Sequence, residues 1–421
     1  MSSYLPCLPC GHLTRKTSSN AVEGWSDRKR KGFVMRIRVR EGFLLILPLV
    51  FSLFFLTSLS IALPTSLYAA ADVPGWWVPG SAEIERTVQR VSGELERTVK
   101  GIYVPIGVAG DSDRMDRLID LVLATELNAM VIDVKDDNGW IAYRSGLDSV
   151  SLYRTQQARL GELQELATRL DELGIYAIAR VVVFKDSRLV LARPELAVQH
   201  RDGGPWRDRT GAAWLDPYSR EAWQYTIDIS VEVAEAGFPE VQFDYVRFPT
   251  DGAVSAARYT WAEENTSRAD VITAFLEEAQ WALAGAGAFS SADVFGLVTT
   301  VADDMRIGQN WERVSAVVDY MSPMVYPSHY GPNIYGLPVP NEAPYETVWH
   351  AMEDGLERTT SRDALIRPWL QDFSWGHRYG PAEVRAQIDA VHDWGVDSWL
   401  LWNAGGVYTR EALLDVDERQ E

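Results

Sequence analysis

The chain has 421 residues, of which 47% are hydrophobic and 24% charged, so it can bury a core and is not a disordered chain. Its two cysteines exclude a disulfide scaffold, a cysteine-based zinc site and an iron–sulfur cluster. A net charge of −19 argues against nucleic-acid binding, which needs clustered positive charge.

The first element in chain order is a leader. A basic run at residues 36–40 precedes the apolar stretch 42–63, and Ala69-Ala70-Ala71 follows. This order predicts a signal peptide over residues 1–71, with Met35 as an alternative start. The apolar stretch is also long enough to span a bilayer, so an uncleaved membrane anchor is the alternative. Both interpretations predict a secreted protein or one attached to the cell envelope.

Residues 72–99 contain prolines and glycines followed by a charged amphipathic stretch, which predicts a linker with a short helix. Residues 1–71 carry nine basic and three acidic residues, so the rest of the chain has a net charge of −25. Sixteen tryptophans and seventeen tyrosines in an acidic chain favour ligand stacking as well as core packing.

From Gly101, short β-branched runs alternate with segments of helical period. Eight such units predict an α/β fold, a single (β/α)₈ TIM barrel over residues 100–410 with a tail at 411–421. An open doubly wound sheet is the alternative, but no Gly-x-Gly-x-x-Gly follows the first strand. The predicted strands are 101–107, 129–135, 176–184, 240–247, 293–300, 318–326, 365–372 and 397–403.

Polar side chains occur where these strands end, and the strand ends of such a barrel form its active-site face. Asp244 is the strongest candidate, because it ends a strand among large aromatic residues with Arg247 near to stabilise a carboxylate. The alternative is an ion pair that only shapes the rim. Asp133 and Lys135 lie on the same face of one strand. They form either part of the active site or a structural ion pair. The other candidates are Arg180, Asp303, Asp304, Tyr326, His329, Asp372, Trp402 and Asn403.

The absence of several motifs from the sequence narrows the classes of reaction that the chain could catalyse. The six histidines are scattered without metal-ligand spacing, and no Gly-x-Ser-x-Gly or phosphate-binding loop occurs, so we expect no metal and no cofactor. Carboxylates and aromatic rings remain, and two carboxyl groups are what glycosidic bond cleavage needs. Five tryptophans are well distributed for stacking on sugar rings, and the alternative for each one taken alone is packing in the core or a loop. They are Trp206, Trp214, Trp369, Trp375 and Trp402.

Six blocks in this order resemble a bacterial family of glycoside hydrolases with a (β/α)₈ domain. They are residues 131–139, 200–223, VQFDYVRFP (241–249), YMSPMVYPSHYGP (320–332), IRPWLQDFSWG (366–376) and WLLWNAGGVY (399–408). The resemblance implies the fold, the broad activity class and a fourth-strand carboxylate, which falls on Asp244. It leaves the second carboxylate open.

These observations predict a glycoside hydrolase that acts on a polysaccharide or oligosaccharide, with Asp244 as nucleophile or base. Asp303 is the predicted acid, ahead of Asp304 and Asp372. A carbohydrate-binding envelope protein without turnover is the alternative, and a carbohydrate esterase a third. The side chains expected to bind sugar or tune the carboxylates are Asp133, Lys135, Arg180, Tyr326, His329, Asp372, Trp402 and Asn403.

Overall fold

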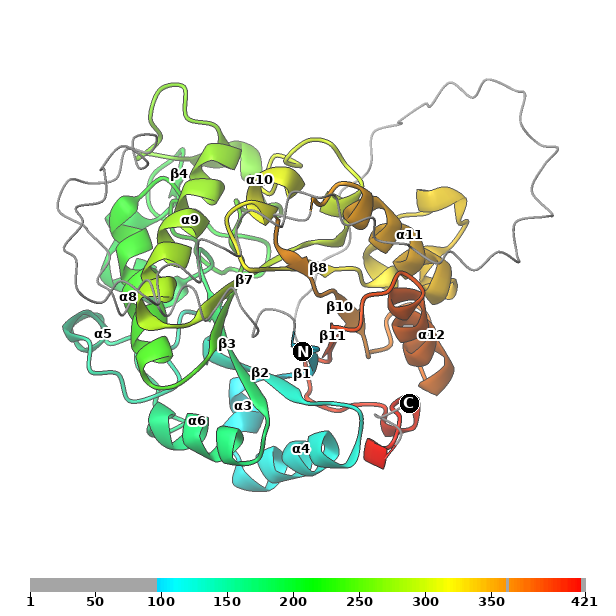
Figure 1. Ribbon diagram of the computed structural model, residues 1–421. Coiled ribbons are helices and arrows are strands. Elements are labelled where there is room, and N and C mark those ends of the chain that lie inside the picture. The colour runs from blue at the N-terminus through cyan, green and yellow to red at the C-terminus, as the bar shows by residue number, and fades with distance from the viewer. Residues whose placement is uncertain (1–96, 361–362, 418–421) are drawn as a thin grey trace, which may run out of the picture. The chain divides into compact units, whose positions relative to one another are not determined.

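A computed structural model of the protein describes residues 97–360 and 363–417, which form a closed parallel barrel (Figure 1). The predicted leader and nearly all of the predicted linker lie outside the described residues. The ring closes because one strand, β10, pairs with both β11 and β8. The eight positions are β1 (Lys100–Val104), β2 (Ala129–Lys135), β3 (Tyr176–Val182), β5 (Glu240–Asp244), β7 (Phe289–Phe295), β8 (Tyr320–Met324), the divided β9 (Leu365–Ile366) and β10 (Trp369–Gln371), and β11 (Trp399–Trp402).

The predicted (β/α)₈ architecture is confirmed, but the fifth strand was misplaced. It was expected at residues 293–300, whereas β7 covers Phe289–Phe295 and a 3₁₀ helix follows over Gly296–Thr299. Ser290 and Ser291 concealed the start of the strand, because serine is a weak strand former. The strand ends at Phe295, and at the next residue, Gly296, a Cβ would clash with the Met324 carbonyl oxygen, so the backbones of β7 and β8 meet closely there.

Helices surround the barrel, as Figure 1 shows for α4, α6, α8, α9, α11 and α12. They cover it with apolar faces; α4, for example, buries Met115, Leu118, Ile119 and Val122 against the sheet. No helix of the described segments is long and apolar enough to cross a membrane. The helices are α3 (Ile106–Ala109), α4 (Ser112–Ala124), α5 (Asp148–Tyr153), α6 (Leu163–Glu172), α7 (Ser187–Ala192), α8 (Arg220–Glu235), α9 (Arg268–Ala286), α10 (Trp311–Ser315), α11 (Pro344–Glu357) and α12 (Pro381–His392).

The barrel interior differs from the layer between sheet and helices. That outer layer holds the large apolar core, whereas the interior combines a small aromatic and aliphatic cluster with buried charges. At the N-terminal end, Glu240 of β5 pairs with Arg367, and both side chains are fully buried. At the C-terminal end, several charged side chains approach the mouth. A short antiparallel pair, β4 (Gln199–His200) and β6 (Ala257–Arg258), lies outside the barrel sheet.

Candidate active site

Four buried ionisable side chains meet inside the barrel at the C-terminal ends of its strands. We call Asp133 of β2, Arg180 of β3, Asp244 of β5 and Asp293 of β7 the rim cluster. Their exposed fractions are only 4%, 2%, 5% and 1%. Because active sites of (β/α)₈ enzymes lie at this face, the rim cluster is the candidate active site.

Arg180 holds the rim cluster together. Its Nη1 donates to Asp133 Oδ1 (2.5 Å), and its Nε donates to Asp244 Oδ2 (3.0 Å), as does its Nη2. The guanidinium carbon lies 5.5 Å and 5.3 Å from the ring centroids of Tyr103 and Trp402, which stack on each other at 3.9 Å. A planar guanidinium with partners on two sides and rings beside it has little freedom, so Arg180 fixes both carboxylates.

Asp244 ends β5 beside an unusual backbone conformation. Its Oδ1 accepts a hydrogen bond from the backbone N–H of Tyr245 (2.6 Å), and Tyr245 has φ of 50°. A bulky residue in the left-handed region is uncommon and costs about 1–3 kcal/mol, and such strain concentrates at functional sites. The Tyr245 N–H and the Arg180 guanidinium together stabilise an anion at Asp244.

Asp293 lies beside Asp244 on the next strand. The β5–β7 register pairs Phe243 with Ala292, so the residues that follow them stand side by side. Burial, together with the nearby Asp244 carboxylate, raises the pKa of Asp293 well above its usual value. The indole Nε1 of Trp369 donates to Asp293 Oδ1 (2.7 Å). Asp293 is therefore suited to carry a proton, whereas Asp244 is suited to carry a charge.

Asp133 is the third carboxyl group of the rim cluster. Burial raises its pKa to about 6, against the opposing effect of Arg180. Its Oδ2 accepts a hydrogen bond from the Tyr103 hydroxyl (2.6 Å). The rim cluster therefore has three carboxyl groups for one guanidinium. This excess of acid favours at least one protonated carboxyl group near neutral pH.

Aromatic side chains from the loops after β8 and β10 stand over the C-terminal end of the barrel. We call Tyr326, His329, Phe373 and Trp375 the aromatic wall. Ring centroids are 5.1 Å apart for Tyr326 and His329, and 5.6 Å apart for His329 and Trp375. Burial lowers the pKa of His329 to about 4, so its ring is neutral above that pH. Trp375 is 38% exposed and can offer a ring face to a ligand.

Asp303, the predicted acid, does not join the rim cluster. It lies eight residues beyond the end of β7, with an exposed side chain that accepts the backbone N–H of Met305 (2.9 Å). Asp304 accepts the N–H of Arg306 in the same turn (3.0 Å). Asp303 was favoured because the fifth strand was placed too late in the sequence, which put Asp293 at the strand's beginning instead of near its end.

Lys135 and Arg247 have other partners than expected. The β2–β3 register shifts between Asp133 and Lys135, and the Lys135 ammonium forms a fully buried ion pair with Asp186 (2.8 Å). Arg247 lies over aromatic rings, including Tyr245 at 5.1 Å, and donates to the carbonyl of Phe248. Arg180 contacts Asp244 directly, and Lys135 braces the loop before α7.

Asp372 and Asn403 join two loops at the mouth. Both oxygens of Asp372 accept hydrogen bonds from Thr409, at 2.8 Å from its N–H and 2.6 Å from its hydroxyl. The Asn403 amide donates to the Asp372 carbonyl (2.5 Å) and accepts the N–H of Gly405. These contacts fix the loops after β10 and β11 and leave both side chains outside the rim cluster.

The predicted stacking tryptophans have different environments. Trp206 and Trp214 are 1% exposed, and their indole groups donate to the Ala253 carbonyl and to Asp208. Trp369 and Trp402 are buried beside the rim cluster, with ring centroids 5.4 Å apart. Only Trp375 of the five has a substantially exposed ring.

Sequence reasoning missed Asp293, Trp369 as its hydrogen-bond donor, and Tyr103 as the partner of Asp133. A signal for Asp293 was present: in FSSADVF the apolar residues Ala292 and Val294 alternate with Ser291 and Asp293. Period-two alternation indicates a strand with one polar face. Within residues 97–360 and 363–417, no group of three or more histidine, cysteine or acidic residues is placed to hold a metal ion.

Residues 101–408 match the model of a family described as "Putative glycosyl hydrolase domain". The PgaB (BpsB) glycoside hydrolase domain from Bordetella bronchiseptica is similar in structure, with a TM-score of 0.54 and 16% identity over 74% of this chain and 95% of that chain. A hypothetical protein from Ruminiclostridium thermocellum ATCC 27405 is 35% identical over 46% of this chain and 97% of its own, with a TM-score of 0.42. None of the curated proteins matches the chain.

Proposed function

The chain belongs to this glycosyl hydrolase family, and from that premise we propose that it cleaves polysaccharide with Asp244 as nucleophile and Asp293 as general acid and base. Hydrolysis of glycosidic bonds is the activity class of the family. The assignment of roles rests on the rim cluster. Two carboxyl groups on neighbouring strands stand side by side, and their surroundings favour a charge on one and a proton on the other.

The first step breaks the glycosidic bond. Asp293 donates its proton to the glycosidic oxygen while the Asp244 carboxylate forms a bond to the anomeric carbon, and the leaving sugar departs as an alcohol. Asp293 is then a carboxylate. In the second step it takes a proton from water, the water oxygen attacks the anomeric carbon, and Asp244 is released.

Strand geometry supports retention of configuration at the anomeric carbon. Neighbouring strands lie about 4.8 Å apart, so parallel side chains at equal level bring their carboxyl groups to roughly 5 Å. Retaining enzymes place the two groups about 5–5.5 Å apart, whereas inverting enzymes need about 6.5–9.5 Å to admit a water. Asp244 and Asp293 are at equal level on β5 and β7.

The substrate is proposed to be an exopolysaccharide or cell-wall polysaccharide outside the cytoplasm. The aromatic wall supports a sugar chain, because aromatic rings stack on the apolar faces of pyranose rings. Residues 36–71 have the order of basic, apolar and small residues that is typical of an exported protein. An uncleaved apolar segment would in addition attach the enzyme to the membrane.

Reducing ends released from a panel of cell-wall polysaccharides and exopolysaccharides test the proposal. We expect the wild-type chain to release them and Asp244→Asn to release none. Asp303→Asn is the matched control, because it makes the same chemical change at an exposed turn and should retain full activity. Proton NMR of the first product formed should show the substrate's own anomer. Activity of Asp244→Asn at the wild-type level, or inverted product, would contradict the assigned roles.

A further inference from the structure

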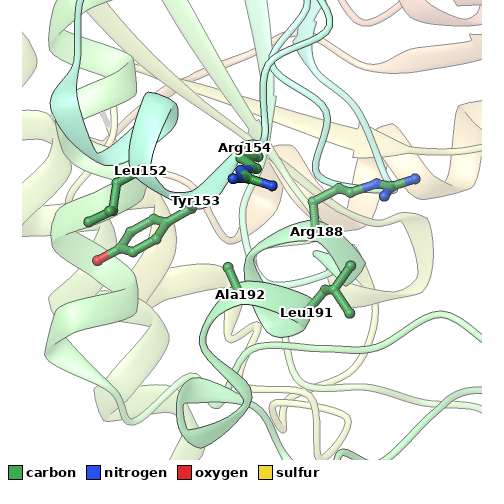
Figure 2. A pocket seen from close by; sticks show the side chains of 6 residues that line it. All are labelled: Leu152, Tyr153, Arg154, Arg188, Leu191 and Ala192. Atoms are coloured by element: carbon green, nitrogen blue, oxygen red, sulfur yellow. The ribbon is translucent and has the colours of Figure 1, made fainter.

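A groove separate from the rim cluster lies between the short helices α5 and α7 (Figure 2). The two helices follow β2 and β3, and α5 lies at the periphery, outside the ring of barrel helices (Figure 1). The groove is mainly apolar with two guanidinium groups beside it. Its lining residues are Leu152, Tyr153, Arg154, Arg188, Leu191 and Ala192.

The two leucines of this groove are unusually exposed. Leu152 is 73% exposed and Leu191 is 75% exposed, the highest fractions among the large hydrophobic side chains of the described residues. Neither leucine side chain is buried in the barrel core. A single exposed leucine is ordinary on a protein surface, but two lining one groove make a combined apolar surface.

The guanidinium groups beside the leucines form no ion pair within the described residues. Neither Arg154 nor Arg188 forms an ion pair with any described carboxylate, although the chain carries 59 acidic residues. Arg188 lies 3.7 Å from the ring centroid of Trp140, which positions it without cancelling its charge. The adjacent Arg193, by contrast, is paired with Glu195 and Glu221.

We propose that the α5/α7 groove docks on the surface of a bilayer that contains anionic lipids. Leu152 and Leu191 enter the boundary of the acyl chains, while Arg154 and Arg188 contact lipid phosphates. Apolar residues flanked by arginines are the composition of interfacial membrane-binding surfaces. A soluble polyanion would satisfy the arginines alone and would leave both leucines in water.

The chain that precedes the barrel is long enough for the groove to reach a bilayer in which residues 42–63 are anchored. Thirty-three residues separate the end of the apolar stretch 42–63 from the first described residue. A random coil of 33 residues would span roughly 30 Å, comparable to the size of the barrel domain. If residues 42–63 anchor the chain, the groove stays within reach of the same bilayer, and a weak surface contact becomes effective through the high local concentration.

Hydrogen exchange on the full chain tests the docking. The chain is mixed with vesicles of phosphatidylcholine alone, or of phosphatidylcholine and phosphatidylglycerol in equal parts. We expect slower exchange at residues 148–154 and 187–193 with the anionic vesicles only, and loss of that protection at high salt. Exchange in these segments that is the same with and without anionic vesicles overturns the proposal, and so does equal protection by soluble polygalacturonate.

Two variants separate docking from attachment by the leader. Leu152→Ser/Leu191→Ser should lose the protection at both helices while the chain remains on the vesicles through its leader. Val407→Ser is the matched control, because Val407 is 69% exposed on the loop after β11, outside the groove, and its change should preserve the protection. Loss of protection in the control, or none in the double variant, contradicts the assignment of this surface.

Discussion

The barrel interior holds one buried charge cluster near each end, and the two clusters differ in balance. At the N-terminal end, the Glu240 carboxylate and the Arg367 guanidinium form a pair without solvent exposure. Tyr176 donates to Glu240 (3.2 Å), and the Arg367 guanidinium lies 4.5 Å from the Tyr320 ring centroid. One positive and one negative charge are matched there.

The rim cluster at the other end is not matched. Asp133, Asp244 and Asp293 lie around the single guanidinium of Arg180, which donates to Asp133 and Asp244, and burial together with the nearby Asp244 carboxylate raises the pKa of Asp293. Burial alone therefore does not distinguish a structural ion pair from a reactive one. The ratio of carboxyl groups to cations does, because only the unbalanced cluster can hold a proton ready for transfer at neutral pH.

The largest effect is expected from Asp244→Asn. Removing the nucleophile should lower kcat on the order of 10⁴-fold, while the melting temperature stays close to the wild-type value because Arg180 keeps Asp133 as its partner. Steady-state kinetics on a cleaved polysaccharide and thermal unfolding give the two readouts. A large loss of stability with little loss of turnover would show that Asp244, like Glu240, serves only in a structural ion pair.

The next effect concerns Asp293→Asn. Without its acid, the enzyme should lose about 10²- to 10⁴-fold in kcat on natural substrates. The loss should be much smaller on aryl glycosides with acidic phenols, which leave without protonation. In the wild-type enzyme, activity should fall as pH rises through the raised pKa of Asp293, since the acid must be protonated. An equal loss on both substrate types would assign the acid role elsewhere.

At the N-terminal end, Arg367→Met should reduce stability by about 3–5 kcal/mol, because Glu240 would then be a buried charge without its cation. The activity of each folded molecule should be unchanged. Urea unfolding followed by tryptophan fluorescence measures the first quantity, and titration of active molecules the second. Adding Glu240→Leu should recover part of the stability, whereas a catalytic defect without unfolding would contradict a purely structural role.

A smaller, pH-dependent effect is expected from Asp133. Its folded-state pKa of about 6 exceeds the usual 3.8, so the folded chain binds more protons between these values. Stability should therefore fall by about 3 kcal/mol as pH rises from about 4 to 6, and then level off. Asp133→Asn should remove this decline from urea-unfolding curves measured across that range. A decline that persists in the variant would assign it to another group.

The smallest effect is expected at the aromatic wall. Trp375→Ala should raise KM about fivefold with little change in kcat, since one stacking ring contributes about 1 kcal/mol. Trp281→Ala is the control, because that ring is 53% exposed on α9 and should leave KM unchanged. A fall in kcat with constant KM would show that Trp375 acts on the reacting groups instead of on binding.

The architecture was predictable because each barrel unit repeats the same alternation of strand and helix. Asp244 was predicted for a local reason: it ends the strand EVQFD and lies between the aromatic residues Phe243 and Tyr245. Arg180 was assigned a tuning role, and the structure gives it contacts to two carboxylates. Predicting candidates of this kind requires only the position at which one strand ends.

Asp293, the proposed second carboxylate, could not be placed as easily, because its position depends on where β7 begins. The polar interior face of β7, with Ser291 and Asp293, lacks the bulky aliphatic residues expected inside a barrel. Lys135 shows a second limit: a register shift between β2 and β3 changed the partner of its ammonium, and local alternation could not reveal it.

Arg180 also constrains how this site can change over evolution. Since one guanidinium contacts Asp133 and Asp244, and the Asp244 carboxylate adds to the effect of burial on the pKa of Asp293, substitutions at these four positions should not combine additively. A change tolerated in one background would be harmful in another, so the order in which substitutions arise matters. Homologues that have replaced one member of the cluster are expected to have replaced a second.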